Sequence, residues 1–179
     1  ICDVSPSSLV RHMAMVLQEP YLFSVSIFEN IQYTSTDITP ADIEAAAQAV
    51  GAHEFIARLP GGYEFIVDQR GGNLSLGERQ LISFARALVA DTRILILDEA
   101  TANVDSYSEM KIQKALNVLL QGRTAIVIAH RLATVRECDR ILVLHHGRLV
   151  EEGHHNQLMV MDDLYAKLYR MNYGSFDDL

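Results

Sequence analysis

Three stretches of the chain are almost entirely apolar, and each is followed by polar or charged side chains. They are residues 13–17, 94–97 and 124–129. Short unbroken apolar runs of this kind predict strands buried on both faces of a parallel sheet. The second run ends in Asp98 and Glu99, at the sheet edge where open α/β folds bind ligands. Gln18 and His130 follow the other two runs, and each taken alone is more typical of a structural hydrogen bond.

The pattern between the first two runs is helical. Residues 39–42 (Thr-Pro-Ala-Asp) combine an N-cap, a proline at the first helical position and an acid three residues after the cap. We expect a helix from there to Val50, and a second short helix over residues 52–59. Ser75 is expected to cap a longer helix over residues 76–89, whose apolar positions recur at helical spacing. The insertion therefore predicts a helical lobe beside the sheet.

Strands and helices alternate along most of the chain, which predicts an α/β fold. Residues 1–18 and 90–160 are expected to form the sheet-containing core, and residues 19–89 the helical insertion. Within the core, residues 139–144 and 148–153 predict a hairpin around His146-Gly147. Residues 161–179 are expected to form a C-terminal helix and tail.

Composition narrows the class of protein. The chain has 179 residues, of which 49% are hydrophobic and 21% charged, as in a soluble globular domain. Its formal net charge of −8 argues against a nucleic-acid-binding surface, which needs clustered Lys and Arg. No apolar run approaches the roughly 20 residues of a membrane span. Two cysteines are too few for a disulfide framework.

Five segments together resemble the motifs of the ATP-binding cassette (ABC) ATPases, in the order and spacing of that family. Leu74-Ser75-Leu76-Gly77-Glu78 resembles the signature motif, usually LSGGQ, and residues 94–99 resemble the Walker B strand with its catalytic glutamate. Ala102, Asn103 and Asp105 fall in a segment like the D-loop, His130 resembles the switch histidine, and Gln18 the Q-loop glutamine. The resemblance implies a P-loop NTPase-like (RecA-like) core with an inserted helical signature subdomain.

The resemblance also implies roles for the residues at the sheet edge. Asp98, and with it Gln18, would hold Mg²⁺, which prefers few carboxylates and keeps several waters. Glu99 would act as general base or orient the attacking water of ATP hydrolysis. Gln18 would couple metal and water to a transmembrane partner, and His130 would contact the γ-phosphate. ATP and Mg²⁺ are thus the implied cofactors.

The signature segment is expected to act on a neighbouring molecule. In ABC ATPases two cassettes enclose two nucleotides head to tail, so Ser75, Leu76, Gly77 and Glu78 would face a nucleotide held by a second cassette. Leu76 replaces the usual first glycine and Glu78 the usual glutamine. Because an acid near a triphosphate costs Coulomb energy unless it points away, we expect this site to be slow.

An apolar cluster follows the Q-loop glutamine. Tyr21, Leu22 and Phe23 are expected to form an exposed patch on a loop, which suits a partner interface. In the resembling family the loop at this position contacts the transmembrane domain. These three residues are therefore the candidates for that interface.

The phosphate cradle of such an enzyme is missing from this sequence. A P-loop needs Gly-Lys-Ser or Gly-Lys-Thr, and no lysine here follows a glycine. We expect the chain to be a cassette incomplete at its N-terminus. By itself it should neither bind Mg-ATP, which calorimetry would test, nor hydrolyse it. Unpaired strand edges should make it prone to aggregation.

The favoured function is the ATP-hydrolysing part of an ABC exporter, acting at the cytoplasmic face of the cell membrane. Phe28-Glu29-Asn30-Ile31 and residues 128–134 are typical of the exporter branch. Its partners would be a transmembrane domain and a second cassette, identical or different, and no nucleic acid. One alternative is a non-catalytic cassette remnant that serves as an interaction module. Another is an ABC ATPase of chromosome maintenance or DNA repair, which the acidic charge and the absence of sustained heptads disfavour.

Overall fold

The computed structural model describes residues 5–33, 35, 37–99, 106–129 and 132–173. The chain forms two compact units, residues 1–128 and residues 129–179. No helix in the described ranges has both the length and the apolar character needed to cross a bilayer. The bounds that the sequence predicts for a core, a helical insertion and a tail stay predictions.

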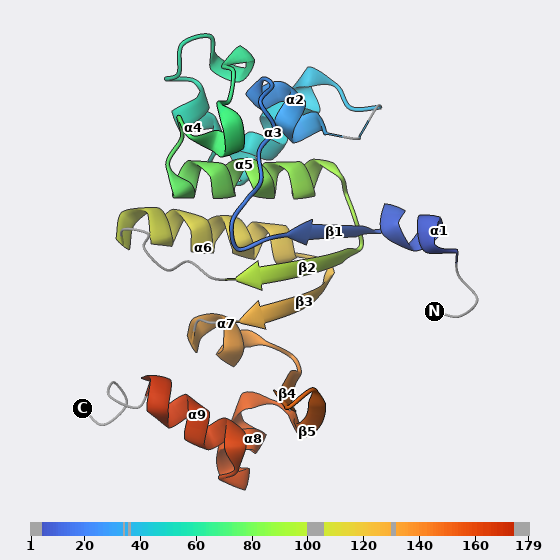
Figure 1. Ribbon diagram of the computed structural model, residues 1–179, viewed down its shortest axis with the longest axis vertical. Coiled ribbons are helices and arrows are strands. Elements are labelled where there is room, and N and C mark those ends of the chain that lie inside the picture. Colours follow the sequence, from blue (N-terminus) through green and yellow to red (C-terminus); the bar gives the residue numbers. More distant parts are fainter. Residues whose placement is uncertain (1–4, 34, 36, 100–105, 130–131, 174–179) are drawn as a thin grey trace. The chain divides into compact units, whose positions relative to one another are not determined.

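The first unit contains a sheet of three strands. They are β1 (Met13–Val16), β2 (Ile94–Glu99) and β3 (Thr124–Ala129), with β2 in the middle. β1 and β2 are parallel, with Val16 level with Leu97, and the three arrows in Figure 1 point the same way. The three apolar runs are therefore strands, and the prediction of an α/β fold with a parallel sheet is confirmed.

Two long helices, α5 (Leu76–Val89) and α6 (Ser106–Leu120), cover one face of this sheet (Figure 1). Leu95 and Leu97 of β2 are buried in the same core as residues of both helices. The alternate residues Ile94 and Ile96 are only half-buried in the described part of the chain. The apolar run predicted that both faces of β2 are buried. In the described part of the chain, only the face with Leu95 and Leu97 is fully buried.

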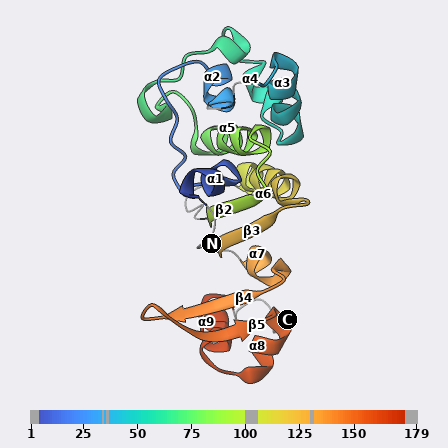
Figure 2. The same cartoon turned by 90° about the vertical axis from the view of Figure 1, so that its right-hand side faces the viewer.

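Short helices form a lobe on the other side of α5. They are α2 (Ile27–Gln32), α3 (Pro40–Ala49) and α4 (His53–Ile56), with 3₁₀ turns at Gly62–Glu64 and Gln69–Gly71. α2 and α3 pack directly against α5, as Figures 1 and 2 show. A further helix, α1 (Pro6–Arg11), precedes β1. The expected helical insertion between the first two strands is thus present.

Local sequence signals explain where these helices begin. Thr39 caps α3, and Asp42 Oδ2 accepts hydrogen bonds from the Thr39 N–H at 2.9 Å and the Thr39 hydroxyl at 2.6 Å, as a capping box requires. Ser26 and Glu29 form the same box at the start of α2. α4 ends at Ile56, before the expected residue 59. The N–H groups of Arg58 and Leu59 bond the oxygens of Phe55 and Ile56, three residues back, at 3.1 Å and 3.0 Å, so the chain leaves the α-helix in a tighter turn.

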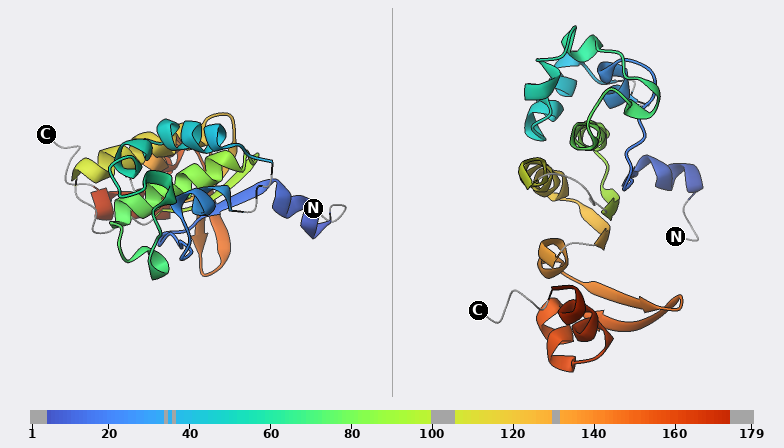
Figure 3. Two further views of the ribbon diagram at one scale, coloured as in Figure 1. Left: turned by 90° about the horizontal axis from the view of Figure 1, so that it is seen from above. Right: turned by 60° about the vertical axis from the view of Figure 1, so that its left-hand side comes forward.

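The second unit is a hairpin with helices. Its elements are α7 (Leu132–Glu137), β4 (Ile141–His145), β5 (Arg148–Gly153), α8 (His155–Met161) and α9 (Leu164–Tyr173). β4 and β5 are antiparallel, and His146 and Gly147 both have positive φ, as a type I′ turn needs. Val143, Leu158, Tyr165 and Tyr169 form its buried core. The predicted hairpin is confirmed (Figure 3).

Candidate functional site

The N-terminal end of α5 is closed by a capping box. Ser75, in extended conformation, precedes the helix and accepts the Glu78 N–H at 3.3 Å through its hydroxyl oxygen. Glu78 Oε2 in turn accepts the Ser75 N–H and the Ser75 hydroxyl, each at 2.8 Å. Leu76 and Gly77 occupy the first helical positions, whose N–H groups have no acceptor within a helix. The prediction that Ser75 caps this helix is confirmed.

Gly77 lies where α5 and α6 approach each other closely. It is buried, and a Cβ atom added to it would lie 3.4 Å from Cβ of Ser108 on α6. That distance is at the short limit of ordinary contacts, so a small residue here permits the close packing of the two helices. The structure thus gives Gly77 a packing role beside any role toward a ligand.

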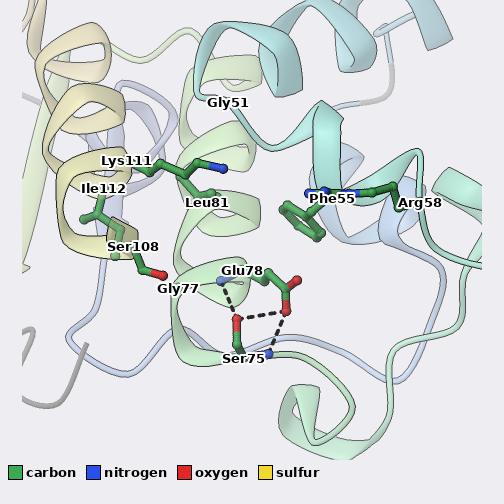
Figure 4. A pocket seen from close by; sticks show the side chains of 10 residues that line it. All are labelled: Gly51, Phe55, Arg58, Ser75, Gly77, Glu78, Leu81, Ser108, Lys111 and Ile112. Atoms are coloured by element: carbon green, nitrogen blue, oxygen red, sulfur yellow. Dashed lines mark hydrogen bonds between the residues drawn. The ribbon is translucent and has the colours of Figure 1, made fainter. Parts of the chain in front are cut away.

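A pocket of about 190 Å³ opens next to Ser75 and Glu78. Three helices and a glycine turn line it, through Gly51, Phe55, Arg58, Ser75, Gly77, Glu78, Leu81, Ser108, Lys111 and Ile112. Figure 4 shows Ser75 and Glu78 joined by hydrogen bonds on one side, with Arg58 and Lys111 on the side away from Ser75. Its floor is partly apolar, while its rim carries two hydroxyls, two cations and one carboxylate.

The carboxyl ends of β1 and β2 meet at one edge of the sheet. Because Val16 is level with Leu97, Gln18 and Asp98 both follow at this edge. Gln18 is exposed and Asp98 is half-buried, and both side chains carry oxygen atoms. Glu99 ends β2, but its side chain lies outside the described part of the structure. His130 and the segment with Ala102, Asn103 and Asp105 also lie outside the described residues.

The loop after β1 presents two aromatic rings rather than three apolar side chains. Tyr21 is 51% exposed and Phe23 38% exposed, but Leu22 is fully buried. The expectation that Leu22 belongs to an exposed patch is therefore wrong. Leu22 packs inward, where its Cδ1 would lie 3.5 Å from a Cβ atom added to Gly71, so it joins this loop to the segment before α5.

A third ring, Tyr33, completes the exposed aromatic cluster that we call the aromatic patch (Tyr21, Phe23 and Tyr33). The rings of Tyr21 and Phe23 meet edge to face at 5.1 Å, and those of Phe23 and Tyr33 stack at 5.5 Å. The guanidinium of Arg86 lies 5.1 Å from the centre of the Tyr33 ring and 5.8 Å from that of Phe23, within the range of cation–π attraction.

Arg86 and Asn30 fix the aromatic patch to the C-terminal end of α5. Arg86 donates to the Asn30 main-chain oxygen at 2.7 Å, to Asn30 Oδ1 at 3.0 Å and to the Tyr21 main-chain oxygen at 3.1 Å. The buried Asn30 amide also bonds both the N–H and the oxygen of Phe23. Burial lowers the pKa of Arg86, against a smaller raising effect of Tyr33.

A second arginine of α5 holds the segment that leads to Ser75. Arg79 donates to the main-chain oxygens of Gly71 at 3.1 Å and Leu74 at 2.7 Å. Arg79 and Arg86 are about two helical turns apart. Through these two side chains, α5 forms hydrogen bonds both with the segment before Ser75 and with the residues of the aromatic patch. α5 is thus the structural link between the two surfaces.

Comparison with known proteins identifies this arrangement. A family model described as "ABC transporter" matches residues 3–102, more than half of the chain. The chain belongs to the ABC transporter family. The resemblance inferred from the five sequence motifs is therefore confirmed.

Relatives in the ABC transporter family match nearly the whole chain. An uncharacterized ABC transporter ATP-binding protein, YknV of Bacillus subtilis, is 51% identical over 98% of this chain and 29% of its own length. An ATP-dependent lipid A-core flippase of Syntrophus aciditrophicus is 47% identical over 97% of the chain and 29% of its own length. The chain therefore spans less than a third of these relatives.

A solved ABC structure has the same fold. It is a bacterial Atm1-family ABC exporter with ATP bound, with a TM-score of 0.86 and 40% identity over 97% of this chain and 30% of that one. This agreement confirms the predicted P-loop NTPase-like core with inserted helices. It does not assign individual site residues.

The sequence motifs did not point to Arg86 or Tyr33 as residues of the site. Asn30 lies in the exporter-like segment Phe28-Glu29-Asn30-Ile31, but that motif did not predict its contacts with Arg86 and Phe23. One signal was available for Arg86: it lies four residues after the buried Ile82, so a charge stands on the apolar face of α5. A charge in that position predicts a buried partner, although not which one.

Proposed function

We propose that this chain is part of the ATP-hydrolysing domain of an ABC exporter. The observation that carries the proposal is the pairing of two surfaces in one unit: the sheet edge with Asp98 and Gln18, and the capped end of α5 beside a pocket. The first suits the chemistry of hydrolysis and the second suits contact with a nucleotide held by another cassette. Family membership and the exporter relatives support the same function.

The oxygen donors at the sheet edge fit Mg²⁺. Asp98 is half-buried and Gln18 exposed, and one or two protein oxygens with several waters is the coordination that Mg²⁺ favours. The bound metal would neutralise charge on the phosphates during hydrolysis. Glu99 would take the proton of the attacking water, and His130 would contact the terminal phosphate.

The chain offers only one of the two surfaces that a nucleotide site between cassettes requires. The sequence has no Gly-Lys-Ser or Gly-Lys-Thr to cradle its phosphates. Ser75, Leu76, Gly77 and Glu78 would instead face the nucleotide of a second cassette, identical to this one or different. Ala102, Asn103 and Asp105 would belong to the same contact between cassettes. The chain in isolation should bind Mg-ATP poorly and not hydrolyse it.

The aromatic patch is the proposed contact for the transmembrane partner. Tyr21 and Phe23 expose their rings while their main chain is held by Arg86 and Asn30. An exposed ring on a fixed main chain loses little conformational entropy when it binds. The full-length transporter would lie in the cell membrane with this chain on the cytoplasmic face.

ATP hydrolysis by the full-length protein tests the proposal. Removing a general base typically lowers turnover by about 10²–10⁴-fold, so Glu99→Gln should lower kcat by that order. Glu137→Gln, an exposed acid on α7, serves as control and should leave kcat unchanged. Wild-type turnover in the Glu99→Gln protein would contradict the proposal, and absence of hydrolysis in the wild type would favour an interaction module.

A further inference from the structure

Glu78 places a negative charge on the very groups that would meet a phosphate. One of its carboxylate oxygens accepts both the Ser75 N–H and the Ser75 hydroxyl, each at 2.8 Å. A serine hydroxyl has a single proton to donate, so Ser75 cannot donate to another anion at the same time. The signature serine is thus occupied by an anion from its own helix.

The chain contains the same box elsewhere, which separates capping from any further role. Ser26 and Glu29 repeat the geometry, with Glu29 Oε2 at 2.9 Å from both the N–H and the hydroxyl of Ser26. That box caps α2 and its residues do not line the pocket beside α5. Capping alone therefore explains the hydrogen bonds, but not the pocket that Glu78 shares with Arg58.

The pocket offers a second position for the Glu78 carboxylate. Glu78 lines it together with Arg58, from the turn after α4, and Lys111, from α6. A carboxylate that leaves Ser75 would move toward Arg58, whose charge compensates for the lost hydrogen bonds, since Lys111 Nζ already lies 3.7 Å from the Glu54 carboxylate.

We propose that Glu78 is an internal competitor for the phosphate of a nucleotide presented by the second cassette, and that it withdraws toward Arg58 when that phosphate binds Ser75. The inference rests on the proposed function, since it requires that the signature surface meets a nucleotide. Glu78 acts through Ser75 and sets the affinity of the site rather than its chemistry. It is a positioning residue, not a catalytic one.

The test is the KM for Mg-ATP of the full-length protein. Glu78→Gln keeps the capping box, because glutamine also serves at that position, but removes the charge. A neutral acceptor holds the hydroxyl less strongly than a carboxylate, so KM should fall about fivefold with kcat changed less than about twofold. Glu29→Gln, the matched change in the other box, should leave KM unchanged.

Salt and a second substitution separate competition from a structural effect. Repulsion between Glu78 and phosphate is screened by salt, so the KM ratio of wild type to Glu78→Gln should shrink as ionic strength rises. Arg58→Gln should raise KM in the wild type, and by less in the Glu78→Gln protein, because the two side chains act on each other. Thermal unfolding should show both variants folded.

The outcomes are distinct. An unchanged KM in Glu78→Gln, an equal fall in Glu29→Gln, or an effect of Arg58→Gln that is the same in both backgrounds would overturn the competition. Loss of hydrolysis in Glu99→Gln with an unchanged KM in Glu78→Gln would leave the proposed function standing and reject only this inference. Full hydrolysis in Glu99→Gln would instead reject the proposed function.

Discussion

The two ends of α5 hold their charged side chains in opposite ways. At the N-terminal end, the Glu78 carboxylate bonds a single neighbouring residue, Ser75, at the rim of a pocket. At the C-terminal end, the Arg86 guanidinium bonds oxygens of two residues far away in the sequence and lies against two aromatic rings. The first contact is local and open to solvent, whereas the second is long-range and largely enclosed.

This difference would suit the two tasks proposed for these surfaces, contact with a nucleotide and contact with a transmembrane partner. A surface that exchanges one anion for another needs a contact that breaks at small cost, as an exposed capping box does. A surface that transmits movement from a partner needs a main chain that does not yield, and a cation bonded to several main-chain oxygens provides it. The helix thus has an exchangeable end and a fixed end.

Replacing Arg86 should have the largest effect, because it would release the fixed end. Arg86→Ala removes a donor from the main-chain oxygens of Tyr21 and Asn30 and one of the two donors to Asn30 Oδ1, and should cost about 3–5 kcal/mol in local stability. Arg86→Lys keeps the charge without the fork of donors and should lose about half of that. Hydrogen exchange of the full-length protein should show α2 and the loop after β1 opening more easily.

An exposed arginine supplies the control for that measurement. Arg11→Ala, in the last turn of α1, should change protection by no more than about 0.5 kcal/mol. If Arg86→Ala left α2 protected as in the wild type, the C-terminal end would be no more fixed than the N-terminal end. The comparison between the two ends would then fail.

The contrast also separates what the sequence could and could not predict. Ser75, its box with Glu78 and the helix that follows were predictable, because capping depends on residues three positions apart. Arg86 bonds residues more than fifty positions away, and no local pattern specifies such partners. Leu22 was misplaced for the same reason, since it is buried in a core formed with residues far away in the sequence.

The fold shows the same difference between local signals, which were predictable, and long-range contacts, which were not. The apolar runs predicted the three strands, and the turn at His146-Gly147 predicted the hairpin, because both signals are local. The extent of burial on each face of β2 depends on which other segments pack there. That could not be predicted from the run itself.

Replacing Gly71 should have a smaller effect. It tests whether the segment before Ser75, at the exchangeable end of α5, is held rigidly by Arg79. The φ of Gly71 is +77°, and a Cβ atom there would lie 2.3 Å from Cδ of Arg79, whose guanidinium is tied to two main-chain oxygens. Gly71→Ala should therefore cost about 1–3 kcal/mol, seen as lower hydrogen-exchange protection at the start of α5. Such a loss would show that the open capping box rests on a rigid segment.

The next glycine is the matched control. Gly72 has φ −60°, and the nearest atom to an added Cβ is a main-chain oxygen at 3.6 Å, an ordinary contact. Gly72→Ala should be neutral or slightly stabilising. Equal losses in the two variants would mean that the segment tolerates neither side chain, for a reason other than the Arg79 contact.

Acid should weaken contacts of the exchangeable kind and spare the fixed end. Hydrogen bonds from Ser26 lower the pKa of Glu29, and those from Thr39 lower the pKa of Asp42. A carboxyl whose pKa is lowered by folding stabilises the fold above its unfolded pKa, and this contribution is lost as pH falls through the folded pKa. As pH falls below about 5, the first turns of α2 and α3 should therefore lose protection, whereas Arg86 stays charged throughout.

Two substitutions show which carboxylate causes the acid-dependent loss of protection at each helix. Glu29→Gln should remove most of the acid-dependent loss at α2 and leave that at α3, and Asp42→Asn should do the reverse. Each variant is the control for the other in a pH series of hydrogen exchange, corrected for the intrinsic exchange rate. If α2 lost the same protection in acid in the Glu29→Gln protein, the charge of the Glu29 carboxylate would not be what holds the box at the start of α2.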